Sequence, residues 1–427
     1  MGLDNVRLHN NNDTELPVNI IIMIAIPFFL FLIGLELWVD HRRKTGFYRF
    51  NDAINSLQLG ILSRISGVLL GLIPFTFYVY FYQNWHLFEI SLDNYLAWFL
   101  AFIAYDLVYY WVHRLSHTVN IMWGSHVVHH SSEEYNLTTA LRQTSTPAIF
   151  AWVISAPLAF IGVPPEMLIA CASLNLVYQF WVHTRHIDKM PAWYEAIFVT
   201  PSHHRVHHAL NKDYIDKNYA GVLILWDKIF GSFQQEKEDT PVVFGISSQL
   251  GTWDPIKANF RVYVNLWQDF KVTKGLKNKF KVWLSPPSWR SLEAKELVPR
   301  RYITTKNMVK FDINLTTGQK SYVLFQHISV ITMTLIWLLS LSSFSTTLLV
   351  ATCLFAIFSL FAISALQENR SYAQIVEGVR ILISSGLVWK LSPLPTIGLT
   401  VGLVYATLSF TLLMAKYRPS TQVLSQN

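Results

Sequence analysis

Apolar segments long enough to cross a lipid bilayer recur along the whole chain, and they constrain its fold more than any other feature. A transmembrane helix needs about 20 mostly apolar residues and satisfies its backbone hydrogen bonds internally. Only 14% of the 427 residues are Asp, Glu, Lys or Arg, against about 25% in soluble domains. The sequence therefore predicts an all-α polytopic membrane protein, and it excludes a disordered chain, a collagen-like fibre and a disulfide scaffold.

We expect about nine transmembrane helices. The run Pro147–Val182 is too long for one span and is broken near Pro164 and Pro165, so it is expected to form a helical hairpin. The other apolar runs are Val18–Leu35, Ile65–Tyr82, Tyr95–Val112, Tyr322–Leu341, Thr346–Leu366, Val379–Leu391 and Ile397–Ala415.

The distribution of positive charge orients these spans. The basic cluster His41–Lys44 follows the first span, and such clusters stay in the cytoplasm. The polar stretch Thr200–Lys320 has a net charge of +8 and is expected on the same face. In it, Lys271–Lys281 alternates Lys with Phe and Leu, which predicts a helix on the bilayer surface rather than a nucleic-acid site. We therefore expect a multi-pass protein of a bacterial inner membrane or the endoplasmic reticulum, with no nucleic acid as partner.

Four regions follow from this pattern. Residues 1–94 are an N-terminal transmembrane region, and residues 95–240 carry the histidine clusters described next. Residues 241–320 are a cytoplasmic basic segment, and residues 321–427 are a C-terminal transmembrane region.

Histidine is concentrated in one part of the chain, because 11 of the 15 histidines lie between His113 and His208. Three clusters have spacings that place imidazoles on one face of a helix. They are His113 with His117, then His126 with His129 and His130, and then His204 with His207 and His208. His183 forms a fourth element. His186 and His203 are further possible ligands.

The number of clustered histidines predicts two metal ions. One ion takes four to six ligands, whereas the three clusters and His183 supply nine. Imidazole favours iron, copper, zinc or nickel. The adjacent pair His129 and His130 would point its rings about 100° apart on a helix, so that each ring can serve a different ion. Together with the spans, this predicts a histidine-rich di-metal cap on the cytoplasmic face.

The motifs HRLSH, HVVHH and HRVHH beside membrane spans resemble those of the fatty acid hydroxylase/sterol desaturase superfamily. Between Ala104 and Phe233, the stretches WGSHVVHHSSEEYNLTTALRQ and TPSHHRVHHALNKDYIDKNYAGVLILWDKIFGSF are similar to the alkylglycerol monooxygenase branch. The resemblance implies a non-haem centre of two iron ions, held by the nine histidines, that activates O2 to hydroxylate a lipid C–H bond. In an ether lipid, hydroxylation beside the ether oxygen would release an aldehyde.

Polar residues near the clusters are candidates for groups that orient the ligands or meet the substrate. Asp106 lies seven residues before His113 on the same helical face, at an otherwise apolar depth. Glu133, Glu134 and Asn136 follow the second cluster and are also expected to contact the ligand imidazoles rather than the metal ions. Arg142 and Gln143 are expected to contact a lipid headgroup or a reductant.

The electron donor is expected to be external, because no Gly-x-Gly-x-x-Gly opens a helix. A pterin such as tetrahydrobiopterin, a cytochrome or a ferredoxin-type protein would serve. Thr118 stands where the alkylglycerol monooxygenase branch typically has Glu, which keeps a sterol, carotenoid or fatty-acid hydroxylase or desaturase as an alternative.

Other classes of protein remain as alternatives. A metal transporter would place ligands at mid-bilayer, and a haem-binding membrane protein would use a histidine pair. A zinc hydrolase would need His-Glu-x-x-His, and that motif does not occur in the sequence.

Overall fold

The computed structural model describes residues 18–70, 72–146, 148–340 and 343–417. Within these residues every regular element is helical, and the only β contacts are two isolated bridges, Phe198 with Leu223 and Ala209 with Phe244. The helices are α1 (Val18–Arg43), α2 (Phe50–Leu70), α3 (Leu72–Trp85), α4 (Tyr95–Thr118), α5 (Asn120–Gly124), α6 (Val127–His130), α7 (Leu137–Ala140), α8 (Ala148–Ile161), α9 (Pro165–Trp181), α10 (Ala192–Glu195), α11 (Pro201–His207), α12 (Leu225–Ile229), α13 (Pro255–Val272), α14 (Leu276–Leu284), α15 (Leu292–Leu297), α16 (Thr317–Leu339), α17 (Thr346–Gln367), α18 (Ala373–Leu391) and α19 (Pro395–Lys416).

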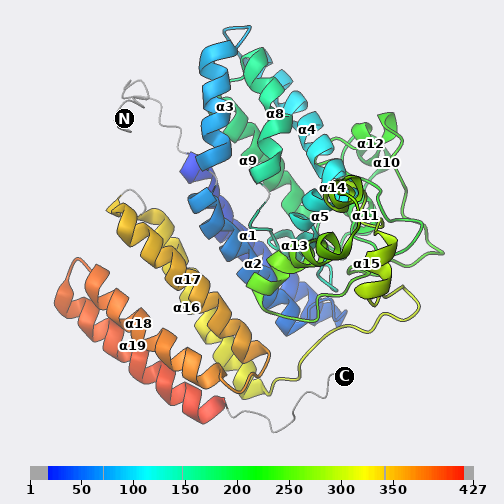
Figure 1. Cartoon of the computed structure of the whole chain (residues 1–427). Helices are drawn as coiled ribbons and strands as arrows, with labels where there is room; N and C mark the ends of the chain where they lie inside the picture. The colour runs from blue at the N-terminus through cyan, green and yellow to red at the C-terminus, as the bar shows by residue number, and fades with distance from the viewer. Residues whose placement is uncertain (1–17, 71, 147, 341–342, 418–427) are drawn as a thin grey trace.

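The long and short helices occupy different parts of the molecule (Figure 1). Helices α3 and α4 pack against α8 and α9, α1 packs against α9, and α2 packs against α3, α16 and α17. The α18–α19 hairpin covers the outer side of α16 and α17. The helix α13 and the short helices α5, α10 to α12, α14 and α15 gather at one end of the long helices (Figure 1). We call this group of helices, their loops and the adjoining short helix α6 the cap.

Among the described residues, five helices are long and apolar enough to cross a membrane, namely α2, α4, α16, α17 and α19. The all-α integral membrane architecture expected from the sequence is therefore confirmed. The number of nine spans and their orientation stay predictions. The predicted span ends Pro147 and Leu341 lie outside the described residues.

One predicted span has different limits in the structure. The apolar run Ile65–Tyr82 falls across the end of α2 and the start of α3, and α2 already begins at Phe50. Its first turns carry buried polar side chains that bind the cap. Asn51 Nδ2 donates to Asp312 Oδ1 over 2.7 Å, and Asn55 Nδ2 donates to the carbonyl of Trp253 over 2.6 Å. A hydropathy pattern misses this start because these polar residues pair with protein rather than with water.

The predicted surface helix Lys271–Lys281 is divided between α13 and α14. Gly275 lies between them with φ 78°, a left-handed conformation that glycine adopts at little cost. Apolar side chains such as Phe260, Trp267 and Phe280 are exposed on these two helices. Their contact with a bilayer surface stays a prediction.

Candidate metal centre

Helix α4 carries the first two histidines into the cap. Its N-terminus is capped by Asn94, whose side chain accepts from Ala97 N, and the helix runs without a break to Thr118. His113 and His117 are four residues apart in its last two turns, so their side chains project from one face. Both are buried.

The structure brings nine histidines together in two groups. In each group, the ligand atoms that the rings offer all lie within 4.8 Å of one another. The first group is His113, His117, His126, His130 and His207, and the second group is His129, His183, His204 and His208. The adjacent histidines 129 and 130, and likewise 207 and 208, contribute to different groups, as the ring directions of neighbouring helical residues require.

The ring nitrogens within each group converge at distances that suit metal ligands. His126 Nε2 lies 2.9 Å from His113 Nε2 and 3.0 Å from His130 Nε2. In the second group, His204 Nε2 lies 3.0 Å from His183 Nε2. Two ligands at right angles, each about 2.1 Å from one ion, would be about 3.0 Å apart. The donor set therefore fits two imidazole-bound metal ions.

Four of the nine rings are fixed by main-chain carbonyls. The Nδ1 of His113 donates to Tyr219 over 2.6 Å, His129 to Arg142 over 2.9 Å, His183 to Gln179 over 2.8 Å and His207 to Lys217 over 2.9 Å. A carbonyl only accepts hydrogen bonds, so Nδ1 carries the hydrogen and the lone pair is on Nε2. Such contacts fix the tautomer and orientation of metal-binding histidines.

A single short segment supports three rings of the first group. We call Asp216–Ala220 the support segment. It supplies the carbonyls of Lys217 and Tyr219, and Asp216 Oδ1 lies 3.5 Å from His117 Nδ1. Asp227 holds the segment in place, since its carboxylate accepts from the backbone N–H groups of Tyr219 and Ala220, each over 2.8 Å. Asp227 therefore positions His113 indirectly, through the backbone of Tyr219.

Asp106 does not contact an imidazole. Its carboxylate is fully buried and accepts from Val222 N over 3.0 Å, Leu223 N over 2.9 Å and Trp226 Nε1 over 2.9 Å. Between these residues and the support segment lies Gly221, where an added Cβ would be 2.8 Å from Asn175 Oδ1. Asp106 thus anchors α4 to the residues that follow the support segment. It was expected to contact a ligand imidazole, but it acts on the ligands only through this backbone.

Burial keeps the cap histidines neutral. Desolvation holds the pKa of His126, His130, His183, His204, His207 and His208 well below the ordinary value, and neighbouring imidazoles contribute to each shift. Desolvation lowers the pKa of His129 to about 4. A neutral imidazole offers the lone pair that a metal requires, so these rings are ready to bind metal at neutral pH.

Glu133 and Glu134 bind cations rather than imidazoles. Glu134 accepts from Arg49 Nε over 2.8 Å, Arg185 Nη2 over 2.8 Å and Lys310 Nζ over 2.5 Å. Glu133 lies 3.1 Å from Arg49 Nη2. The two carboxylates are buried and tie distant parts of the cap to the start of α2. The sequence did not show this role, because Arg49 and Lys310 are far away along the chain.

Asn136 caps the short helix α7, with its side chain accepting from Thr138 N, and its Nδ2 donates to the carbonyl of Phe47. It contacts none of the nine histidines. His186 packs against Phe47 and His203 against Phe233, and neither belongs to a metal group.

Arg142 and Gln143 have different surroundings. The Arg142 side chain is buried and donates to the carbonyl of Val128 over 2.9 Å and to Ser131 Oγ over 3.0 Å. It holds the end of α6, which carries His129 and His130, rather than facing a headgroup. Gln143 lines the cavity described next, as a substrate contact would.

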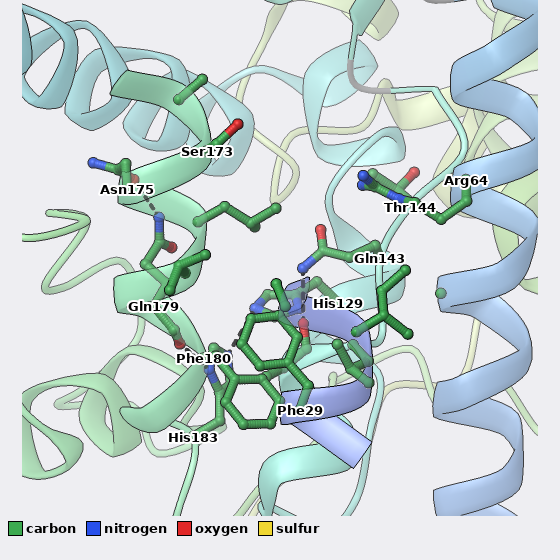
Figure 2. Close-up of a pocket in the computed structure, with 18 of the residues that line it drawn as sticks. Phe29, Arg64, His129, Gln143, Thr144, Ser173, Asn175, Gln179, Phe180 and His183 are labelled. Carbon is green, nitrogen blue, oxygen red and sulfur yellow. Dashed lines mark hydrogen bonds between the residues drawn. The ribbon is translucent and has the colours of Figure 1, made fainter. Parts of the chain in front are cut away.

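A cavity of about 630 Å³ leads from the long helices to the histidines (Figure 2). Its walls are mostly apolar side chains of α1, α2, α4, α9 and α16. The stacked rings of Phe29 and Phe180, with centroids 4.0 Å apart, stand beside His129 and His183 (Figure 2). His113 and His126 of the first group also line it. The cavity therefore gives an extended apolar molecule access to both metal groups.

Aromatic residues surround the site in two ways. Tyr109 and Phe180 line the cavity. Trp123 instead packs on the rings of His117 and His130, with centroids 5.2 Å and 5.7 Å away. Tyr135, which the sequence did not single out, stacks on His183 and donates to the carbonyl of Val182.

Comparison with known proteins finds hydroxylases and monooxygenases. The family model described as fatty acid hydroxylase matches residues 98–232. The human protein named alkylglycerol monooxygenase is 39% identical over 84% of this chain and 80% of its own length. The zebrafish (Danio rerio) protein of that name is 41% identical over 62% of this chain and 59% of its own length. An ornithine lipid hydroxylase of Rhizobium tropici is 24% identical over 35% of this chain and 46% of its own length. No solved structure matches.

Proposed function

The chain belongs to the alkylglycerol monooxygenase family, and from that premise we propose that it is a membrane-bound monooxygenase with two non-haem iron ions. Its substrate is a single-chain ether lipid, which it hydroxylates at the carbon beside the ether oxygen. The nine histidines of the two groups are the proposed iron ligands.

One observation carries this proposal, namely that an apolar cavity between long helices reaches histidines of both groups. Ligand sites are typically clefts of about 300–1,000 Å³ with few polar groups, and this cavity has the apolar walls that an alkyl group requires. Because the cavity lies among candidate membrane spans, a lipid can approach it from the bilayer.

When bound, the two iron ions would supply O2 activation and the insertion of one oxygen atom into a C–H bond. The protein contributes position and environment. The carbonyls of Tyr219, Arg142, Gln179 and Lys217 keep the imidazole rings in place, while the apolar walls align the alkyl chain and exclude water.

The overall reaction balances with an external two-electron donor. One atom of O2 enters the C–H bond, and the other leaves as water with two protons and two electrons. The resulting hemiacetal breaks its C–O bond to give a fatty aldehyde and glycerol. We propose tetrahydrobiopterin as the donor, on the strength of the resemblance to the family.

The proposed membrane arrangement follows from the charge pattern. The cap, which contains the basic stretch Thr200–Lys320, lies at the cytoplasmic face of a bacterial inner membrane or the endoplasmic reticulum. Residues 95–240 form the oxygenase region, flanked by transmembrane regions 1–94 and 321–427, with 241–320 as a cytoplasmic segment. Protease protection of sealed vesicles would test this orientation.

The test is metal and product analysis of the purified protein in nanodiscs. We expect about two iron ions per chain, and release of aldehyde from an alkylglycerol supplied with O2 and tetrahydrobiopterin. His208→Ala should abolish product while the protein remains inserted in the membrane. His86→Ala, at a histidine outside both groups, is the matched control and should keep full activity.

Other products would replace the proposal with a specific alternative. Hydroxylation of sterols, carotenoids or fatty acids without ether cleavage would favour the other branches of the superfamily. The Thr118 hydroxyl, which donates to the carbonyl of Arg114, is compatible with those branches. Zinc in place of iron, or a haem absorption band, would contradict the di-iron assignment.

A further inference from the structure

Arg64 is the one permanently charged residue among the described residues that line the cavity. It lies on α2, a candidate membrane span, and its side chain points from that helix into the cavity beside Thr144 (Figure 2). Ionisable side chains inside membrane segments are costly and usually serve a function. The presence of a guanidinium in an otherwise apolar wall therefore requires an explanation.

Nothing in the described part of the chain neutralises Arg64. No carboxylate, carbonyl or hydroxyl of these residues forms a hydrogen bond or ion pair with it. Arg64 is partly exposed. The fully buried Arg142 and Arg380, by contrast, are well paired, since Arg142 donates to Val128 and Ser131 and Arg380 lies 2.7 Å from Glu377 on α18. An unpaired charge in apolar surroundings is unfavourable, so an anionic group bound in the cavity would supply the partner that the Arg64 guanidinium lacks.

The position of Arg64 relative to the histidines suits a headgroup. Gly60 on α2 lies so close to the backbone of Leu141 that a Cβ added to this glycine would be 2.6 Å from the carbonyl oxygen of Leu141. The next residue, Arg142, provides the carbonyl that supports His129. Arg64 is one helical turn, about 6 Å, beyond Gly60. A molecule with one carbon at the histidines can thus present a polar group, several atoms away, to Arg64.

We propose that Arg64 forms a subsite for the acidic headgroup of a single-chain lipid, either a phosphate or a carboxylate. This inference rests on the proposed function for the identity of the reacting carbon. The planar guanidinium donates two parallel hydrogen bonds to such an anion. The alkyl chain then lies along the apolar side chains of α1, α9 and α16 that line the same cavity.

The first test compares ether lipids that share an alkyl chain but carry a neutral glycerol, a glycerol phosphate or a glycerate headgroup. In wild type, kcat/KM should be higher for the acidic lipids. Arg64→Gln should reduce the ratio of kcat/KM for acidic lipids to kcat/KM for neutral lipids by about tenfold, which corresponds to about 1.4 kcal/mol. The change should appear mainly in KM. Arg64→Lys should restore part of the ratio. Arg301→Gln, at an exposed arginine of the cap, should leave the ratio unchanged.

The second test measures binding without turnover. Hexadecyl phosphate, palmitate and hexadecanol compete for the cavity against a fluorescent alkyl probe in nanodiscs. A preference for one or both anions that disappears in Arg64→Gln supports the subsite, and the preferred anion identifies its source. Equal binding of all three by wild type, or an unchanged preference in the variant, overturns the inference. An anion preference without ether cleavage would instead refute the proposed function and keep the subsite.

Discussion

The ring of His113 donates its Nδ1 hydrogen to the main-chain carbonyl of Tyr219 over 2.6 Å. The same Tyr219 holds its own N–H on Asp227, 2.8 Å away. A carboxylate that never touches the metal groups therefore determines the direction of a histidine in the first group.

Asp227→Asn should weaken iron binding in the first group. The amide retains one acceptor oxygen, so the backbone N–H of Tyr219 or Ala220 loses its partner and the support segment shifts. Mutation of residues that hydrogen-bond to metal ligands typically reduces the affinity for the metal 10- to 100-fold. Iron titration should show one weakened site and one unchanged site. Asp213→Asn, at an exposed carboxylate just before the segment, should bind both ions normally. Equal behaviour of the two variants would contradict the role of Asp227.

His129→Ala and His130→Ala should each remove a different iron ion. The two residues are neighbours in the chain but belong to the second and the first group. We expect each variant to retain about one ion per chain and to lose oxygenation. Elemental analysis combined with Mössbauer spectroscopy would identify the remaining ion by its ligand set. Identical spectra from the two variants would contradict the assignment of His129 and His130 to different metal ions.

Acidification should destabilise the metal-free protein between about pH 6.5 and 4. Burial lowers the pKa of His129 to about 4, while an unfolded histidine titrates near 6.5. The unfolded chain thus binds protons first as the pH falls, so the stabilisation is complete above pH 6.5 and is lost on the way to 4. Between neutral pH and pH 4, the protonation of His129 in the unfolded chain alone lowers the free energy of unfolding by about 3 kcal/mol.

Denaturant unfolding in detergent at several pH values would measure this loss. The other buried cap histidines shift in the same direction, so the slope should exceed that of one group. A stability that does not change across this range would show that the rings take up protons in the folded protein as readily as in the unfolded chain.

Ala172→Phe should shorten the alkyl chain that the cavity accepts. Ala172 lines the cavity on α9, eleven residues before His183 and so about 16 Å away along a helix axis. A phenyl group there blocks the far end of the cavity. Turnover of long-chain ethers should fall at least about tenfold, while short-chain ethers remain good substrates. Leu174→Phe, on the exposed face of the same helix, should not change the chain-length profile.

The sequence predicted the arrangement of the ligands better than their supports. The spacing of His113 and His117, placed at the end of an apolar run, was enough to put both rings on one helical face. The carbonyls of Tyr219 and Lys217 could not be identified, because every residue has a carbonyl and only the path of the chain brings these two to the rings.

Polar side chains were harder to interpret than the histidines. Glu134 stands four residues after His130, yet it pairs with Arg49, Arg185 and Lys310, whose proximity depends on the packing of the cap against α2. Arg64 drew no attention in the sequence, since a single arginine just before the apolar run Ile65–Tyr82 indicates neither a cavity nor a direction. Its significance appeared only with the lining of the cavity.

The support segment also bears on how this protein can change over evolutionary time. Two of its three polar contacts with the histidines use the main chain, which side-chain replacement at Lys217 or Tyr219 cannot delete. The site should therefore tolerate many substitutions at Lys217, whereas the buried Tyr219 ring also packs against His113, His117 and His207. Insertion or removal of one residue between Asp216 and Ala220 would instead misalign His113, His117 and His207 together, so the length of this segment, more than its composition, is what selection must preserve.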